Sequence, residues 1–190
     1  LILFKNKKPL IAAVNGEAVG IGATMLLPMD FRICSEEARF GFVFARRGIV
    51  PEAASSWFLP RLVGITKALE LCYSGKIISA EEAEDINLVS EVLPKERLID
   101  RALAVANEFT AESSQISIAI TMQMMWSMLG ADDPMEAHKI DSRGVFELGQ
   151  SGEAIEGVKS FLEKRPPSFP GKVSKDMPSF YPWWDEKEFE

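Results

Sequence analysis

The most apolar stretch of the chain, residues 9–29, is also the stretch whose interruptions most limit what it can form. It is long enough for a bilayer span, but Asn15, Glu17, three glycines and Pro28 interrupt it, which favours a series of short buried elements. Residues 10–14 are continuously apolar and end at Asn-Gly, a pattern typical of a strand buried on both faces. We therefore expect a layered α/β core.

The residues that follow predict one strand, helix, strand unit. A glycine opens a helix over residues 20–27, and residues 31–34 form the next short strand. Residues 40–51 contain two glycines, two arginines and several aromatic residues without a sustained period. Such a segment is typical of a loop around a functional site.

Helical signals dominate the rest of the chain. Helices are expected over residues 53–62 and 66–73, the second ending at a glycine that can adopt the left-handed conformation. Ser79 and Glu82 have the spacing of a capping box, and residues 88–93 predict an edge strand. Apolar spacing is helical from residue 95 to residue 164.

Composition shifts once more after residue 164, where prolines and aromatic residues accumulate. This tail cannot form its own core, so we expect it to pack across the domain or onto a neighbouring subunit. The predicted organisation is an α/β core over residues 1–95, a helical layer over 96–165 and a Pro/aromatic tail over 166–190.

Charge and cysteine content exclude several classes of protein. With 28 acidic and 21 basic side chains the formal net charge is −7, so neither nucleic acid nor an anionic membrane is an expected partner. Cys34 and Cys72 have no metal-ligand spacing and form no disulfide framework, so we expect no metal site and a reducing compartment, provisionally the cytoplasm. The chain begins with Leu, already within the apolar pattern, so any targeting segment would lie outside this sequence.

Few residues carry chemistry by themselves. Gly16, Gly20 and Gly22 match neither a dinucleotide fingerprint nor a phosphate loop. These glycines can form a turn into a helix N-terminus, where free backbone amides stabilise an oxyanion. Alternatively, they serve only to bring strand and helix close together. Glu52, among apolar neighbours, is either a proton-transfer group or an exposed acid at a helix start. His138 lacks the partners of a triad or a zinc site.

Taken together, several segments resemble the crotonase, or enoyl-CoA hydratase/isomerase, superfamily. In chain order they are KPLIAAVNG at 8–16, GIG at 20–22, Asp30, Phe40-Gly41, GIVPE at 48–52 and FLEKR at 161–165. The resemblance implies a ββα spiral core with a C-terminal helical trimerisation layer, and coenzyme A thioester substrates. It also implies that the N-terminal part of the fold, with a second oxyanion donor, precedes the first residue here.

The resemblance assigns roles to residues at the start of the predicted helix and beyond it. The family holds the thioester carbonyl with two backbone amides, and one of these matches the N–H of Ile21, between Gly20 and Gly22 of the oxyanion loop. Hydratases of the family use two glutamates, which match Thr24 and Phe44 here. Neither residue can exchange protons with water at neutral pH, so ordinary hydration is disfavoured unless another acid, such as Glu17, enters the site.

Glu52 matches the single catalytic glutamate of the enoyl-CoA delta-isomerase branch, which is therefore the preferred branch. One carboxylate suffices to shift a 3-enoyl thioester to its 2-enoyl isomer. From their proximity in sequence, the apolar residues Phe44, Val50, Pro51 and Ala53 are expected to line the site and keep water from Glu52. Thr24 and Phe44, with Phe161 and Lys164 near the C-terminus, are expected to contact substrate. No cofactor is expected, since coenzyme A is part of the substrate, and the expected assembly is a homotrimer or a dimer of trimers.

Two other functions remain open at this point. One is a hydratase-like lyase with an atypical acid. The other is a non-catalytic acyl-CoA-binding or assembly module, because both hydratase acids are replaced. Gain of water by the product would favour the first, and thioester binding without turnover would favour the second.

Overall fold

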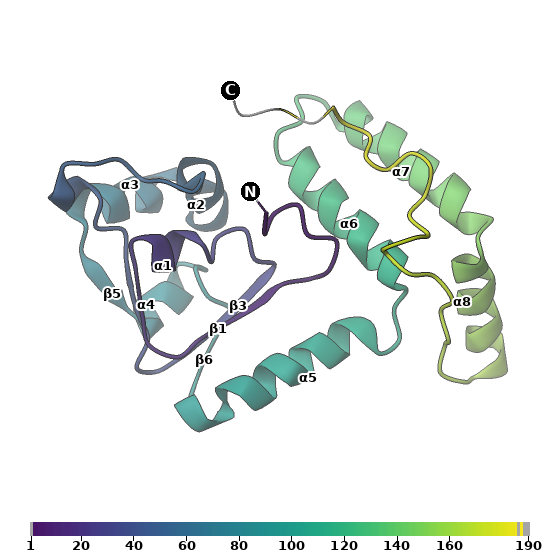
Figure 1. The fold of residues 1–190 in the computed structure, drawn as a ribbon, viewed down its shortest axis with the longest axis horizontal. Coiled ribbons are helices and arrows are strands. Elements are labelled where there is room, and N and C mark those ends of the chain that lie inside the picture. Colours follow the sequence, from purple (N-terminus) through teal and green to yellow (C-terminus); the bar gives the residue numbers. More distant parts are fainter. Residues whose placement is uncertain (1, 186, 188–190) are drawn as a thin grey trace. The chain divides into compact units, whose positions relative to one another are not determined.

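The structure, a computed structural model, describes residues 2–185 and 187 of the chain. The chain divides into two compact units, Leu1–Asn107 and Glu108–Glu190 (Figure 1). Helix α5 (Leu98–Thr110) begins in the first unit and ends in the second.

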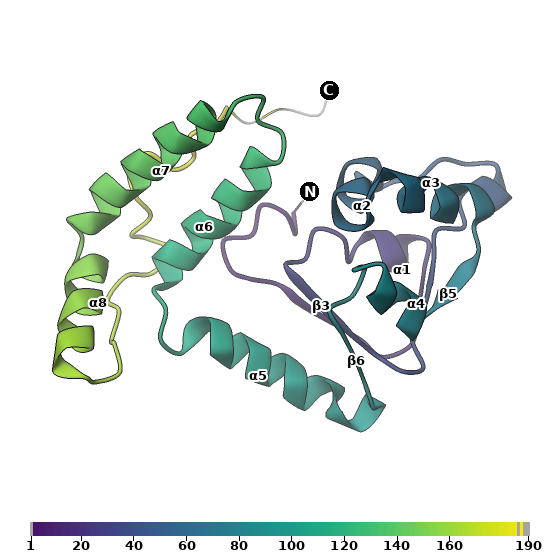
Figure 2. The same ribbon diagram turned by 180° about the vertical axis from the view of Figure 1, so that it is seen from behind.

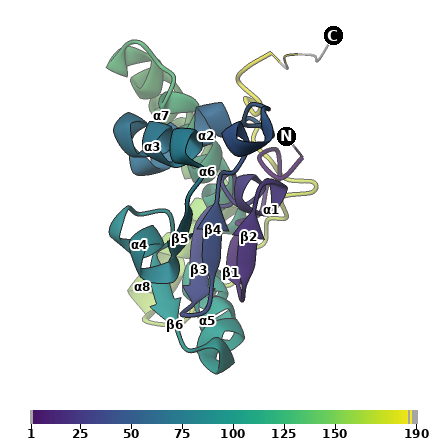
Figure 3. The same cartoon turned by 90° about the vertical axis from the view of Figure 1, so that its left-hand side faces the viewer.

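Two small sheets form the centre of the first unit (Figure 3). One sheet is parallel throughout, in the order β1-β3-β6, and Ala12 of β1 pairs with Arg32 of β3. The other has the order β2-β4-β5, with β2 parallel and β5 antiparallel to β4. The strands are β1 (Ile11–Val14), β2 (Glu17–Val19), β3 (Phe31–Ser35), β4 (Arg39–Gly41), β5 (Ile77–Ser79) and β6 (Glu91–Leu93).

Strand β1 is less buried than its sequence predicts. Within the described residues it pairs with β3 alone, so it lies at the edge of its sheet and only Ala12 is buried. The expectation of a strand buried on both faces is therefore wrong for this structure. An apolar run shows only that a strand is hydrophobic. It does not show whether other elements pack against both faces of that strand.

The helix predicted over residues 20–27 is shorter in the structure. Helix α1 covers only Ile21–Thr24. After it the amides of Leu26 and Leu27 bond three residues back, at 3.3 Å each, which tightens the chain into turns. Pro28, which has no amide hydrogen, follows these turns, and β3 begins at Phe31. The predicted strand, helix, strand order is confirmed, with β2 as an additional strand between β1 and α1.

Three helices, one strand and two 3₁₀ turns complete the description of the first unit. Helices α2 (Ser55–Val63) and α3 (Ile65–Ser74) pack against each other, and Gly75 caps α3 in the left-handed conformation, as predicted. Helix α4 (Ala80–Asp85) has the predicted capping box of Ser79 and Glu82. The predicted edge strand is confirmed only as Glu91–Leu93, since Leu88 and Val89 lie in the turn before it. The unit also contains two 3₁₀ turns, η1 (Ala45–Arg47) and η2 (Lys95–Arg97).

The core of the first unit is built from large side chains of the sheets, of α2 and α3, and of the segments that follow α1 and β4. Burial of such side chains is the main favourable contribution to folding. The largest fully buried residues are Phe40, Phe42, Phe58, Leu27, Ile33, Leu59, Leu71 and Ile78.

The second unit is helical, as its apolar spacing predicts. Helices α6 (Gln115–Met128), α7 (Pro134–Gly149) and α8 (Gly152–Glu163) follow one another, with contacts between α6 and α7 and between α7 and α8. Ser114 and Asp133 cap α6 and α7 by accepting amide hydrogen bonds. Figure 2 shows these helices from behind, with the chain after α8 passing back along them.

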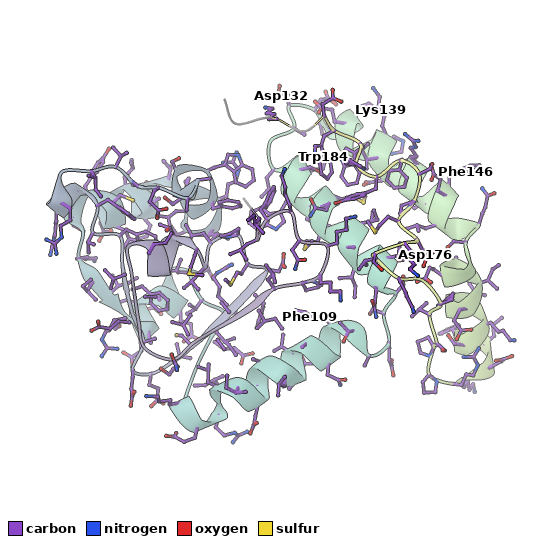
Figure 4. The ribbon with its side chains drawn as sticks, in the orientation of Figure 1. Phe109, Asp132, Lys139, Phe146, Asp176 and Trp184 are labelled. Atoms are coloured by element: carbon purple, nitrogen blue, oxygen red, sulfur yellow. The ribbon has the colours of Figure 1, made fainter. Side chains whose placement is uncertain are left out.

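The tail packs within the second unit. Val173 is buried against Ile116 and Ala119 of α6, and Phe180 is buried beside Gly144 of α7. Figure 4 labels Trp184 of this tail and Phe146, an exposed side chain of α7. None of the helices that the structure describes has both the length and the apolar character needed to cross a membrane.

Candidate active site

Thr24 and Glu52 form the centre of the candidate site. The hydroxyl of Thr24, at the end of α1, donates to Oε1 of Glu52, which precedes α2. Thr24 is completely buried, whereas Glu52 is exposed. The structure thus brings together two residues that the sequence singles out for different reasons.

The turn after Glu52 has an unusual backbone. Ala53 and Ala54 both adopt the left-handed conformation, with φ of 55° and 57°. This conformation is unfavourable for a residue with a Cβ atom, and strained backbone of this kind is concentrated at functional sites. The helix predicted from residue 53 therefore begins only at Ser55.

Ser55 holds the backbone of Glu52. Its amide donates to the carbonyl of Glu52 at 3.0 Å, and its hydroxyl donates to the same oxygen at 2.6 Å. The side chain of Ser55 is buried, so water does not compete for this contact. The main chain and the carboxylate of Glu52 are therefore each fixed by a buried hydroxyl, those of Ser55 and Thr24.

Sequence reasoning missed Ser55 and the two left-handed alanines. A serine three residues after an acid at a helix start is a weak signal that the serine hydroxyl donates to the main-chain carbonyl of that acid. No sequence signal indicates left-handed alanines, because alanine favours helix.

The start of α1 presents backbone amides. Gly20 has φ of 59° and ψ of −122°, and its carbonyl accepts from the amides of Ala23 and Thr24 at 3.0 Å each. Its own amide donates to the carbonyl of Gly41 at 2.9 Å. Among the hydrogen bonds within the described residues, none takes up the amide of Ile21, whose side chain is 60% exposed.

The expected apolar shield around Glu52 is not formed by its sequence neighbours. Val50 is 79% exposed, Ala53 is exposed and Pro51 is only half-buried, while Phe44 is turned into the core with 6% exposure. That expectation rests on proximity in sequence alone, which does not set the direction of a side chain, and of these four residues only Phe44 is buried. Phe44 lies just before η1, and its carbonyl accepts from the amide of Arg47 at 2.8 Å.

A hollow of 310 Å³ lies along β1, β2 and α1. It is lined by residues of both strands and by Gly22, and the lining includes Glu17, an exposed residue. Glu17 is the acid that the sequence leaves as an alternative to the two missing glutamates.

Phe161 and Lys164 lie in the second unit. Phe161 is 81% exposed near the end of α8, and Lys164 follows the helix in the left-handed conformation. Their contact with substrate stays a prediction.

Three further polar residues, His138, Cys34 and Arg46, form no site among the described residues. His138 is exposed on α7. Burial raises the pKa of the Cys34 thiol to about 11, which keeps it protonated and unreactive at neutral pH. Arg46 donates from Nε to the carbonyl of Ser74 at 2.6 Å and so ties η1 to the end of α3. In the described part of the chain, no three His, Cys, Asp or Glu side chains gather where they could hold a metal ion.

Comparison with known proteins identifies the family. The family model for enoyl-CoA hydratase/isomerase matches residues 1–172. An enoyl-CoA hydratase of Alternaria alternata is 44% identical over 170 residues, which cover 89% of this chain and 57% of that protein. The 1,2-epoxyphenylacetyl-CoA isomerase of Escherichia coli is 33% identical over 176 residues, covering 90% of this chain and 64% of that protein.

Solved structures agree with this assignment. The crystal structure of an enoyl-CoA hydratase from Bacillus anthracis superposes with a TM-score of 0.85 at 30% identity, covering 90% of this chain and 66% of that one. The chain thus spans less than two thirds of the length of the relatives named here. With its sequence match and its α/β fold in agreement, this chain belongs to the enoyl-CoA hydratase/isomerase family of the crotonase superfamily.

Proposed function

We propose that this chain carries the site of an enoyl-CoA isomerase, which moves the double bond of 3-enoyl-CoA to give 2-enoyl-CoA. The observation that supports this function best is the contact between Thr24 and Glu52. By resemblance, Thr24 occupies the position of one hydratase glutamate and Phe44 that of the other. Of these three positions, only Glu52 then has a carboxylate, and isomerisation needs only one carboxylate.

The proposed reaction is a proton transfer in two steps. Glu52 removes a proton from C2 of the 3-enoyl thioester, and the electron pair of the C–H bond moves into a dienolate whose negative charge lies on the thioester oxygen. The amide of Ile21 donates to that oxygen, since an oxyanion is stabilised most by a donor already in place. The dienolate then takes the proton from the Glu52 carboxylic acid at C4, which yields the 2-enoyl thioester and restores the carboxylate.

The substrate class follows from family membership and is part of the proposal. An acyl-CoA thioester supplies the carbonyl oxygen on which the dienolate charge rests, so the proposed chemistry requires no cofactor. A second oxyanion donor is expected from a segment that is not among residues 1–190, and for this reason activity is to be measured on the intact natural protein.

Hydration is the second candidate, because the relatives from Alternaria and Bacillus are named hydratases. It requires a further acid to activate water, and Glu17 beside the hollow is the residue to test for that role.

One pair of assays separates the two functions. The intact protein is incubated with a 3-enoyl-CoA and, separately, with a 2-enoyl-CoA, while absorbance reports conjugation and mass spectrometry reports water addition. Conjugation of the first substrate without a change of mass is the expected result. Water addition to the second without isomerisation of the first would contradict the proposal, and binding of both thioesters without turnover would favour a non-catalytic acyl-CoA-binding module.

We also propose that the protein is a homotrimer or a dimer of trimers, assembled through its second unit. Helices α7 and α8 carry apolar side chains that are exposed in the single chain, and surfaces of this kind are typical of subunit contacts. These side chains are Val145, Phe146, Ile155, Val158, Phe161 and Leu162.

A further inference from the structure

We infer that Thr24 is a positioning residue for the proton-transfer group, because its hydroxyl holds Oε1 of Glu52 and leaves Oε2 to take the proton from substrate. This inference rests on the proposed isomerase function. It gives Thr24 a role different from the substrate contact that the sequence predicts. The inference is carried by three features of the geometry.

The first feature is the burial of the donor. Thr24 has no exposed surface, and its hydroxyl donates directly to Oε1 of Glu52. An exposed glutamate side chain has several rotamers in water, and a hydrogen bond from a buried donor restricts them. Because Thr24 is branched at Cβ and lies in a helix, its own side chain has few alternatives.

The second feature is that only one carboxylate oxygen is occupied. The described contacts give Glu52 a single side-chain hydrogen bond, the one from Thr24 to Oε1. The other oxygen, Oε2, has no hydrogen-bond partner among the described residues. A base that must take a proton from C2 and return it at C4 needs one oxygen fixed and one free.

The third feature is a second acceptor for the same hydroxyl. The carbonyl oxygen of Ile21 lies 3.4 Å from the hydroxyl oxygen of Thr24. A hydroxyl has one proton and two lone pairs, so it can donate to the Glu52 carboxylate before proton abstraction. Once Oε2 carries the proton, Oε1 is still an acceptor, so the same hydroxyl can keep donating to it. Thr24 can therefore hold Glu52 in both protonation states.

A set of matched variants tests this inference. Thr24→Val keeps the shape of the side chain and removes the hydroxyl, whereas Thr24→Ser keeps the hydroxyl. Thr66→Val makes the same change at an exposed position of α3 and serves as the control. Glu52→Gln and the double variant Thr24→Val/Glu52→Gln complete a cycle, and thermal unfolding of each variant confirms that it is folded.

The expected result is a loss of kcat without a matching change of KM. Removing a hydrogen bond to a charged group corresponds to roughly a 10- to 100-fold loss, so we expect this decrease in kcat for Thr24→Val. Thr24→Ser should recover most of the activity, and Thr66→Val should leave it unchanged. In the Glu52→Gln background, Thr24→Val should have no further effect.

A label experiment adds a readout that a packing role would not change. With substrate deuterated at C2, a held carboxylic acid returns deuterium to C4, whereas a freely rotating one exchanges with water first. We therefore expect Thr24→Val to lower the deuterium content at C4.

Other outcomes would overturn the inference in distinguishable ways. Full activity of Thr24→Val, or a loss that Thr24→Ser shares, would exclude a positioning hydroxyl even if Glu52→Gln is inactive. Full isomerase activity of Glu52→Gln would instead refute the proposed function itself.

Discussion

The hydroxyl of Thr24 and the carboxylate of Glu52 meet across 28 positions of sequence, one at the end of α1 and the other before α2. Each residue is held by its own backbone surroundings, since Thr24 is buried within the turn that Gly20 opens and Glu52 is fixed by Ser55. The contact therefore joins two preorganised segments, as a reactive group requires.

Ser55→Ala should weaken both stability and catalysis. The variant loses the 2.6 Å hydrogen bond from the hydroxyl to the carbonyl of Glu52. We expect the free energy of unfolding to fall by about 1 kcal/mol and kcat to fall while KM is kept. Urea unfolding and isomerase kinetics measure both quantities. Ser56→Ala, at the exposed neighbouring position, is the control, and equal effects of the two substitutions would contradict the role given to Ser55.

Ala54→Gly should stabilise the protein. A left-handed residue with a Cβ atom costs ~1–2 kcal/mol, which exceeds the entropic cost of glycine of roughly 0.5–1 kcal/mol. We therefore expect a gain of about 0.5 kcal/mol at Ala54, where φ is 57°. The same substitution at Ala104, exposed within α5, should instead lower stability by ~1 kcal/mol. Urea unfolding measures the free energy of unfolding of both variants. A lower free energy of unfolding for Ala54→Gly would show that the conformation of Ala54 is not strained.

The parts of this fold that follow from local sequence were predictable. The capping box of Ser79 and Glu82 and the glycine cap of α3 each depend on residues within one turn. Strands β2, β4 and β5 have only three residues each, which is too short to show a period. The left-handed Ala53 and Ala54 oppose the preference of alanine for helix, so tertiary contacts determine that turn.

The candidate site was predictable only in part, for a related physical reason. Resemblance to the family indicated Thr24 and Glu52 separately, but a contact across 28 positions depends on the fold rather than on spacing. The fixed carbonyl of Glu52 was missed because a serine three residues after an acid is only a weak signal, and Glu-Ala-Ala-Ser-Ser contains two serines.

Gly171→Ala should loosen the tail of the second unit. A Cβ atom at this position would lie 2.7 Å from Oε1 of Glu153 and 2.9 Å from Cγ1 of Ile116. Buried Glu153 also accepts from the amide of Gly171 at 2.7 Å and from the hydroxyl of Ser114. We expect a loss of ~1–3 kcal/mol from this overpacking, measured by urea unfolding with tryptophan fluorescence. Gly149→Ala meets no atom within 4 Å and is the control, and equal stability of the two variants would contradict the contact.

Leu162→Glu should prevent assembly if the second unit carries the subunit contact. The side chain is exposed on α8, and a charge in an apolar interface is unfavourable. Sedimentation velocity should show trimers or hexamers for the natural protein and smaller species for the variant. Ile65→Glu places the same charge on exposed α3 of the first unit and should leave assembly intact. An unchanged sedimentation coefficient for Leu162→Glu would exclude this face.

The stability of the second unit should fall at acidic pH through Glu156. Arg165 donates to both carboxylate oxygens of Glu156, at 2.6 and 2.9 Å, and the amide of Ser168 donates at 2.6 Å. These contacts lower the pKa of Glu156 from its usual 4.5 to about 2. A carboxylate with a depressed pKa in the folded state stabilises the fold above the unfolded value, and that contribution is lost as pH falls from about 4.5 to about 2.

Urea unfolding as a function of pH measures this contribution for the natural protein and for Glu156→Gln. The difference in stability between the two should shrink as pH falls through this window. Added salt should reduce the difference at neutral pH, since the pair is at the surface. Glu163→Gln is a useful comparison, because Glu163 accepts from the same arginine at 2.7 Å, while no backbone amide of the described residues donates to its carboxylate. Parallel curves for the natural protein and Glu156→Gln across the whole range would show that the arginine and amide contacts do not act on the folded state.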